Sequence, residues 1–165
     1  MNVNDVENIN TLMPYNVRLR YEYVNLIMRY SWDWYFTLTF KDTIHQEEAE
    51  KRFRYFINAI NKLLYGSHWR RYGNTVEYVK ATELQYRGVI HFHIILHTPD
   101  RELTKNHLIY FHKKWLKLAG ISDLKDIENI KSIEDVSRYC SKNVTRDGEY
   151  GIEYHFRRNK DYQSS

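Results

Sequence analysis

The sequence predicts an α+β domain with an antiparallel sheet of about five strands and helices packed mainly on one face. Short runs of aromatic and β-branched residues alternate, whereas longer runs repeat their apolar residues at helical spacing. From the first strand onward these runs follow the order β-α-β-β-α-β, the ferredoxin-like pattern. With 165 residues, 42% of them hydrophobic, and only two prolines, the chain is expected to form a single domain over 1–165.

The first third of the chain is expected to hold two helices and one strand. Residues 1–13 are polar and rich in Asn, and form a loose lead-in to a helix over 15–30. The run 35–40, YFTLTF, alternates like a half-buried strand. Thr43 begins a capping-box pattern, T-x-x-Q, and so predicts the start of a helix over 44–65.

The middle of the chain is expected to form a loop, a hairpin and a helix. Residues 67–74 are read as a basic aromatic loop, and strands over 75–85 and 89–97 follow. Thr104 can cap a helix over 104–119. This helix and the preceding one are expected to cover the same apolar face of the sheet.

The last third of the chain is expected to alternate strand, helix and strand. A short edge strand is placed within 124–130, and a helix over 132–144 begins at the capping residue Ser132. Residues 150–156 alternate as the last strand, and the polar tail 157–165 is expected to fray.

Composition narrows the classes of partner and compartment. The net charge of +4 is a mild basic bias, which fits a polyanionic partner without requiring one. The lone cysteine, Cys140, excludes an intrachain disulfide and fits a reducing compartment. No apolar run approaches the roughly 20 residues that span a bilayer, so no membrane partner is expected. The first residues lack the basic and apolar regions of a signal peptide.

Two histidines and a carboxylate form the strongest chemical signal. His91 and His93 lie two residues apart on a predicted strand, so they point to one face. Whether Glu83 joins them depends on the hairpin register. A three-residue loop over 86–88, with Gly88 in the left-handed conformation, pairs Glu83 with His91. A two-residue loop would instead send the carboxylate into the core, which is costly.

Two imidazoles and one carboxylate suit a divalent cation that keeps open positions for a substrate. Mn²⁺ and Mg²⁺ are the expected metals, and Zn²⁺ or Co²⁺ would also fit the donor set. Gln85 lies on the same strand face as Glu83 and is the reserve third ligand. The alternative is that His91 and His93 merely occupy a half-buried face of the sheet.

Tyr139 and Lys142 stand three residues apart on the predicted helix 132–144 and therefore share one side of it. Tyr139 is placed at the edge of the apolar stripe rather than at its centre. A phenol can attack a phosphodiester once it is activated, and an ammonium group can neutralise the charge that develops. The alternative is that Tyr139 simply packs, as one of fifteen tyrosines.

At this point the sequence resembles the HUH endonucleases, and within them the single-tyrosine replication initiators of rolling-circle plasmids and single-stranded DNA viruses. Residues 36–40 resemble the first motif of these initiators, and His91-Phe92-His93 is the His-hydrophobe-His motif. Tyr139-Cys-Ser-Lys142 fits the Tyr-x-x-Lys motif, and Glu83 stands where the acidic third ligand stands.

The resemblance implies a ferredoxin-like or RRM-like palm that nicks and rejoins single-stranded DNA at an origin, including one presented in a hairpin loop. Tyr139 would be the nucleophile, Lys142 its electrostatic helper, and Glu83, His91 and His93 the metal ligands. The compartment would be a bacterial cytoplasm or a host nucleus. No Walker A sequence is present, so a helicase domain is expected to have been removed, or a host helicase and polymerase to be borrowed.

Two other functions are weighed against the initiator. A non-catalytic RRM-like domain that binds single-stranded nucleic acid would explain the tyrosines and the basic charge. An HUH transposase usually carries glutamine where this chain has Lys142. For DNA contacts, the candidate phosphate-binding side chains are Lys41, Arg70, Arg71 and Arg87. The candidate stacking rings are Trp32, Trp34 and Trp69.

Overall fold

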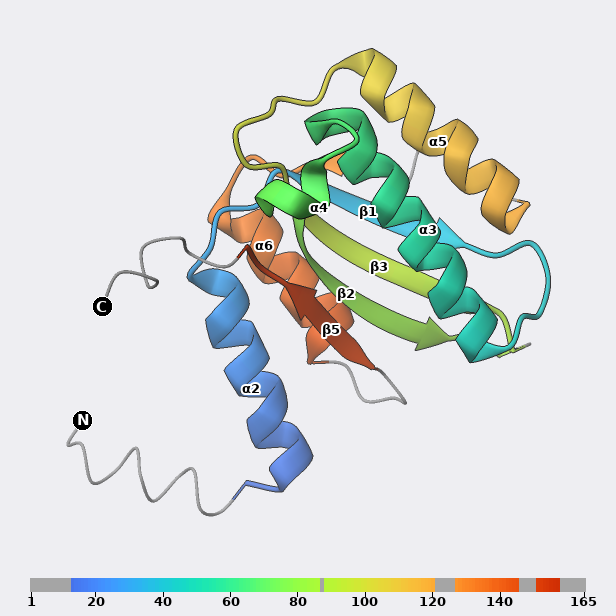
Figure 1. Ribbon diagram of the computed structural model, residues 1–165. Helices are drawn as coiled ribbons and strands as arrows, with labels where there is room; N and C mark the ends of the chain where they lie inside the picture. The colour runs from blue at the N-terminus through green and yellow to red at the C-terminus, as the bar shows by residue number, and fades with distance from the viewer. Residues whose placement is uncertain (1–12, 87, 121–126, 146–150, 158–165) are drawn as a thin grey trace.

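The computed structural model describes residues 13–86, 88–120, 127–145 and 151–157. Within them the strands form one antiparallel sheet in the order β4-β1-β3-β2-β5 (Figure 1). The strands are β1 Trp34–Thr39, β2 Glu77–Leu84, β3 Ile90–His97, β4 Ile127–Asn129 and β5 Ile152–His155. The first four follow the ferredoxin-like order, so the predicted α+β class is confirmed.

Helices cover both faces of the sheet (Figure 1). The α-helices are α2 Tyr15–Met28, α3 Gln46–Tyr65, α4 Trp69–Tyr72, α5 Lys105–Ala119 and α6 Ile133–Tyr139, and a π-helix, η2 Cys140–Val144, continues α6. Helices α3 and α5 lie on one face, as expected, while α2, α6 and η2 pack on the other.

The main core lies between the sheet and the pair α3 and α5. Alternation along β1 and β3 directs Phe36 and Phe92 to this face, where Phe53 of α3 and Trp115 of α5 cover them. All four side chains are buried. Trp115 also donates an indole N–H to the Thr39 carbonyl at 3.0 Å, which ties α5 to the end of β1. This face is a packed scaffold.

The opposite face carries a second, smaller core. Val79 of β2 and Ile95 of β3 point to it, and Ile27 of α2 and Val136 of α6 close it. Trp32 is buried in the same cluster and donates to the Ile27 carbonyl at 2.9 Å, so it is not a surface stacking ring. Because His91 and His93 alternate in step with Ile95, the candidate site opens on this second face.

Several expected element boundaries shift in the structure. Helix α3 begins at Gln46 after His45, which makes no side-chain cap, so the predicted Thr43 cap is wrong. Thr104 does cap α5: its side chain accepts from the His107 N–H at 3.3 Å. The basic aromatic segment contains the short helix α4.

Some predictions fall on residues outside the described ranges. These are most of the lead-in, the start of the edge strand, and nearly all of the polar tail. Among the described residues, no helix is long and apolar enough to cross a membrane.

Candidate active site

The β2–β3 hairpin has the register that the ligand chemistry requires. Glu83 lies directly opposite His91, and the Gln85 N–H donates to the Val89 carbonyl at 2.9 Å. The Gly88 N–H donates to the Gln85 carbonyl, also at 2.9 Å, and Gly88 has a φ of 72°. This left-handed conformation is costly for any residue with a Cβ, which explains the glycine. The three-residue loop is therefore confirmed.

Glu83 and His93 are in contact across the two strands. Their Oε2 and Nε2 atoms are 2.6 Å apart. The His91 ring lies beside that of His93, with centroids 6.4 Å apart and planes inclined by 27°. As the side chains stand, no three His, Cys, Asp or Glu residues of the described chain form a group that could hold a metal ion. The structure thus brings the three predicted ligands to one patch, with Glu83 and His93 touching.

Hydroxyl groups of β1 engage the Nδ1 atoms of both histidines. The Tyr35 hydroxyl is 3.0 Å from Nδ1 of His93, and the Thr39 hydroxyl is 3.3 Å from Nδ1 of His91. Thr37 adds a hydrogen bond to the Tyr35 hydroxyl at 3.2 Å. Metal-binding imidazoles characteristically have their second nitrogen held in this way. The donor set and its support therefore fit a divalent cation bound through the Nε2 atoms.

These β1 partners were not identified as site residues from the sequence. The alternation of YFTLTF does place Tyr35, Thr37 and Thr39 on one face. Only the pairing of β1 with β3, which sets Tyr35 beside Ile95 and Thr39 beside His91, reveals that this face is the histidine face.

Tyr139 lies inside the second core, and not at the edge of the apolar stripe as predicted. Its side chain is 4% exposed, and its hydroxyl donates to the backbone carbonyls of His93, at 3.2 Å, and Val79, at 3.4 Å. Its ring meets that of Tyr35 edge-on, with centroids 5.6 Å apart. The cause of the burial is tertiary, because α2 packs on α6 and η2 and presses them onto the sheet.

Burial raises the pKa of Tyr139 well above its ordinary value, and the neighbouring Tyr35 and Cys140 act in the same direction. The phenol is therefore neutral at physiological pH. It touches the backbone of His93, so the tyrosine and the ligand patch are adjacent.

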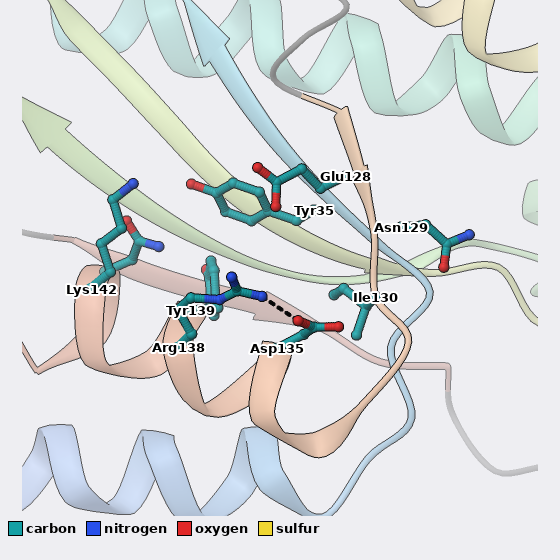
Figure 2. A pocket seen from close by; sticks show the side chains of 9 residues that line it. Tyr35, Glu128, Asn129, Ile130, Asp135, Arg138, Tyr139 and Lys142 are labelled. Atoms are coloured by element: carbon teal, nitrogen blue, oxygen red, sulfur yellow. Dashed lines mark hydrogen bonds and ion pairs between the residues drawn. The ribbon is translucent and has the colours of Figure 1, made fainter.

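Lys142 follows in the π-helix η2 and is exposed. It lines a cavity of about 180 Å³ together with Tyr35 and Tyr139. Figure 2 shows Arg138 and Lys142 rising from the helix, with the Tyr35 ring and Glu128 on the opposite wall. A π-helical turn is rare and is frequently found at functional sites. Lys142 thus lies on the same side of the sheet as the ligand patch, as the Tyr-x-x-Lys spacing predicted.

The candidate DNA contacts separate into two regions. Lys41 is exposed just after β1, at the end of the sheet where Thr39 pairs with His91. Arg70 and Arg71 lie in α4, before β2 begins, and an eight-residue strand rising about 3.3 Å per residue separates them from Glu83. The Arg70 guanidinium stacks 4.8 Å from the Trp69 ring centroid. Arg87 lies outside the described residues.

The fold and the site together define an α+β domain whose second sheet face carries a histidine–carboxylate patch beside a buried tyrosine. The family model for the ORF2-type replication-associated protein matches residues 33–147, more than half of the chain. The chain therefore belongs to this family of replication-associated proteins. The match covers β1, the hairpin and the tyrosine helix. No curated protein and no solved structure matches the chain significantly.

Proposed function

We propose that this protein is a metal-dependent, site-specific single-stranded DNA endonuclease and strand transferase that initiates rolling-circle replication. One observation carries the proposal: Glu83 touches His93 at 2.6 Å on the sheet face where the Tyr139 hydroxyl meets the His93 carbonyl. Membership of a replication-associated family supports initiation of replication over transposition.

Glu83, His91 and His93 would hold Mn²⁺ or Mg²⁺. When bound, the cation supplies a Lewis acid for the scissile phosphate. Glu83 and His93 already converge, and His91 would complete the set by a change of side-chain rotamer. The hydroxyls of Tyr35 and Thr39 orient the two rings, which reduces the cost of arranging the ligands.

The Tyr139 hydroxyl would act as the nucleophile. Its oxygen attacks the phosphorus, the bond from phosphorus to the 3′ oxygen breaks, the phenol loses its proton, and the 3′ oxygen gains one. The products are a 5′-phosphotyrosine and a 3′-OH. Because the hydroxyl donates to two backbone carbonyls, Tyr139 must leave these partners before it can reach a phosphate. Lys142 would neutralise charge on the phosphate.

The same chemistry run in reverse rejoins DNA. The phosphotyrosine keeps the energy of the broken linkage, so a later 3′-OH can attack it and release Tyr139. The proposed partner is therefore single-stranded DNA of an origin, including a hairpin loop. The 3′-OH primes a polymerase, and a helicase, either in an attached domain or from the host, unwinds the duplex.

The test is incubation of the full chain with a library of labelled single-stranded oligonucleotides and Mn²⁺. Cleavage at one sequence and a covalent protein–DNA band are expected together. Tyr139→Phe should abolish both while retaining DNA binding, whereas Tyr55→Phe, on the outer face of α3, should change neither. A covalent band that persists in Tyr139→Phe would refute Tyr139 as the nucleophile.

The burial of Tyr139 favours a second candidate, a non-catalytic RRM-like domain that binds single-stranded DNA. In that case Tyr139 is only a core residue, and the ligand patch serves no reaction. The same assay separates the two functions, because the binding domain retains oligonucleotides without cutting them at any Mn²⁺ concentration.

A further inference from the structure

The cavity beside Tyr139 has a feature that neither nicking nor metal binding explains. It lies between the helical turn α6–η2 and the edge of the sheet formed by β1 and β4 (Figure 2). Tyr35 and Tyr139 contribute aromatic walls, Glu128 projects from β4, and Arg138 and Lys142 stand on the helix side. The cavity is thus aromatic in part and charged at its rim.

Asn143 lines this cavity with an unpaired donor. The residue is 5% exposed, and its Nδ2 atom has no hydrogen-bond partner within the part of the chain that the structure describes. Buried polar groups are nearly always hydrogen-bonded, because an unpaired one loses its contacts with water and gains nothing in return. A ligand that brings an acceptor into the cavity would satisfy Asn143.

The dimensions and walls of the cavity point to a planar ring. A cavity of roughly 150 Å³ holds one benzene ring, and this one is about 180 Å³. An isolated phosphate has little affinity for a cavity lined by Tyr35 and by the carboxylates Glu128 and Asp135. A nucleobase fits better, since it stacks on aromatic rings and carries carbonyl or ring-nitrogen acceptors.

Positive charges stand where the backbone of such a nucleotide would lie. Lys142 and Arg138 are exposed, and the Arg138 guanidinium is held by Asp135 in an ion pair. A base inside the cavity therefore places its phosphates against cations on the outside. Because Tyr139 forms part of the wall, this phosphate would be close to the nucleophile.

We propose that the cavity receives one unstacked base of the substrate strand, of pyrimidine size, adjacent to the scissile phosphate. Asn143 donates to a carbonyl or ring nitrogen of that base, Tyr35 packs on it, and Lys142 contacts the neighbouring phosphate. The cavity is then a specificity site, which selects where the strand is cut. This inference rests on the proposed function for the identity of the strand.

The test measures binding rather than cleavage. An oligonucleotide that contains the cleavage site, or the tightest-binding one if none is cut, is prepared with an abasic site at each position in turn. Affinity is measured by fluorescence anisotropy. In the wild-type protein, loss of one base is expected to weaken binding about tenfold, the contribution of one stacked base. In Asn143→Leu, similar in size but without a donor, that penalty should fall to about twofold or less.

Asn25→Leu, an exposed position on α2, is the matched control and should keep the wild-type abasic profile. If Asn143→Leu does not fold, Asn143→Ser, a shorter hydroxyl donor, replaces it and should show a reduced penalty. An identical profile in wild type and variant, or no sensitive position in the wild type, overturns the base site. Cleavage with such a profile leaves the nuclease standing, whereas an Asn143-dependent profile without cleavage leaves only the base site standing.

Discussion

Replacing Tyr35 with Phe removes one oxygen atom from the candidate metal site and leaves the aromatic ring in place. That oxygen lies 3.0 Å from Nδ1 of His93 and accepts a hydrogen bond from Thr37 at 3.2 Å. Without it, the His93 ring loses the contact that fixes its orientation and its protonated nitrogen. The variant should therefore bind Mn²⁺ more weakly than the wild type.

The size of the effect follows from the geometry. Loss of a partner of this kind typically lowers metal affinity by roughly 10–100-fold, or about 1.4–2.7 kcal/mol. The Thr37 hydroxyl lies 3.5 Å from the same Nδ1 atom and can take over part of the contact. We therefore expect about tenfold for Tyr35→Phe and about 100-fold when Thr37→Val is added. Folding stability should fall by only about 1 kcal/mol, the net value of one hydrogen bond.

Isothermal titration calorimetry with Mn²⁺ measures the affinity, and urea unfolding without metal measures the stability. Tyr55→Phe loses the same hydroxyl on the far side of the sheet and serves as the control. A Tyr35→Phe variant that binds Mn²⁺ as tightly as the wild type would show that the hydroxyl does not position His93. Absence of binding in the wild type would remove the metal site altogether.

Two further predictions concern the scaffold. Gly88→Ala should destabilise the fold by about 1–2 kcal/mol from the left-handed backbone alone, and by more because the new Cβ would lie 3.3 Å from the Thr43 methyl group; Gly66→Ala, with φ 83° and nothing within 4 Å, should show only the backbone cost in urea unfolding. The second concerns His97 and Asp33, 2.7 Å apart. The hydrogen bond to Asp33 raises the pKa of His97 above 6.5, while at Asp33 burial opposes ionisation but hydrogen bonds outweigh it and lower its pKa below 3.8. The pair should therefore stabilise the fold fully between these two values, and lose its contribution as pH rises through the folded pKa of His97 or falls through that of Asp33. Thermal unfolding of wild type and Asp33→Asn from pH 3 to 9 checks this, and a difference that does not change with pH would contradict it.

Local sequence signals were sufficient where the structure repeats with a short period. The alternation of β3 assigns His91 and His93 to one face, and the glycine at position 88 determines a loop that sets Glu83 opposite His91. Both conclusions need only residues within one hairpin. The same alternation along β1 and the helical spacing in 44–65 indicated which side chains fill the main core.

Boundaries and burial were predicted less well. The capping pattern at Thr43 did not start the helix, which begins at Gln46. Helical spacing placed Tyr139 at the rim of its apolar stripe, yet it is fully enclosed. A stripe on one helix does not say how many neighbours will cover it. Here α2 and the sheet close around Tyr139 from both sides.

The sequence by itself determined the order of the elements, the hairpin register and the residue types gathered at its end, because backbone periodicity and turn geometry act over a few residues. Only the tertiary structure decided what surrounds them. The Tyr35 hydroxyl reaches His93 across 58 positions of the chain, and the Tyr139 hydroxyl reaches the His93 carbonyl across 46. Such contacts depend on how sheet and helices pack, and so do the second partner of each histidine, the burial of the tyrosine and the unpaired amide of Asn143.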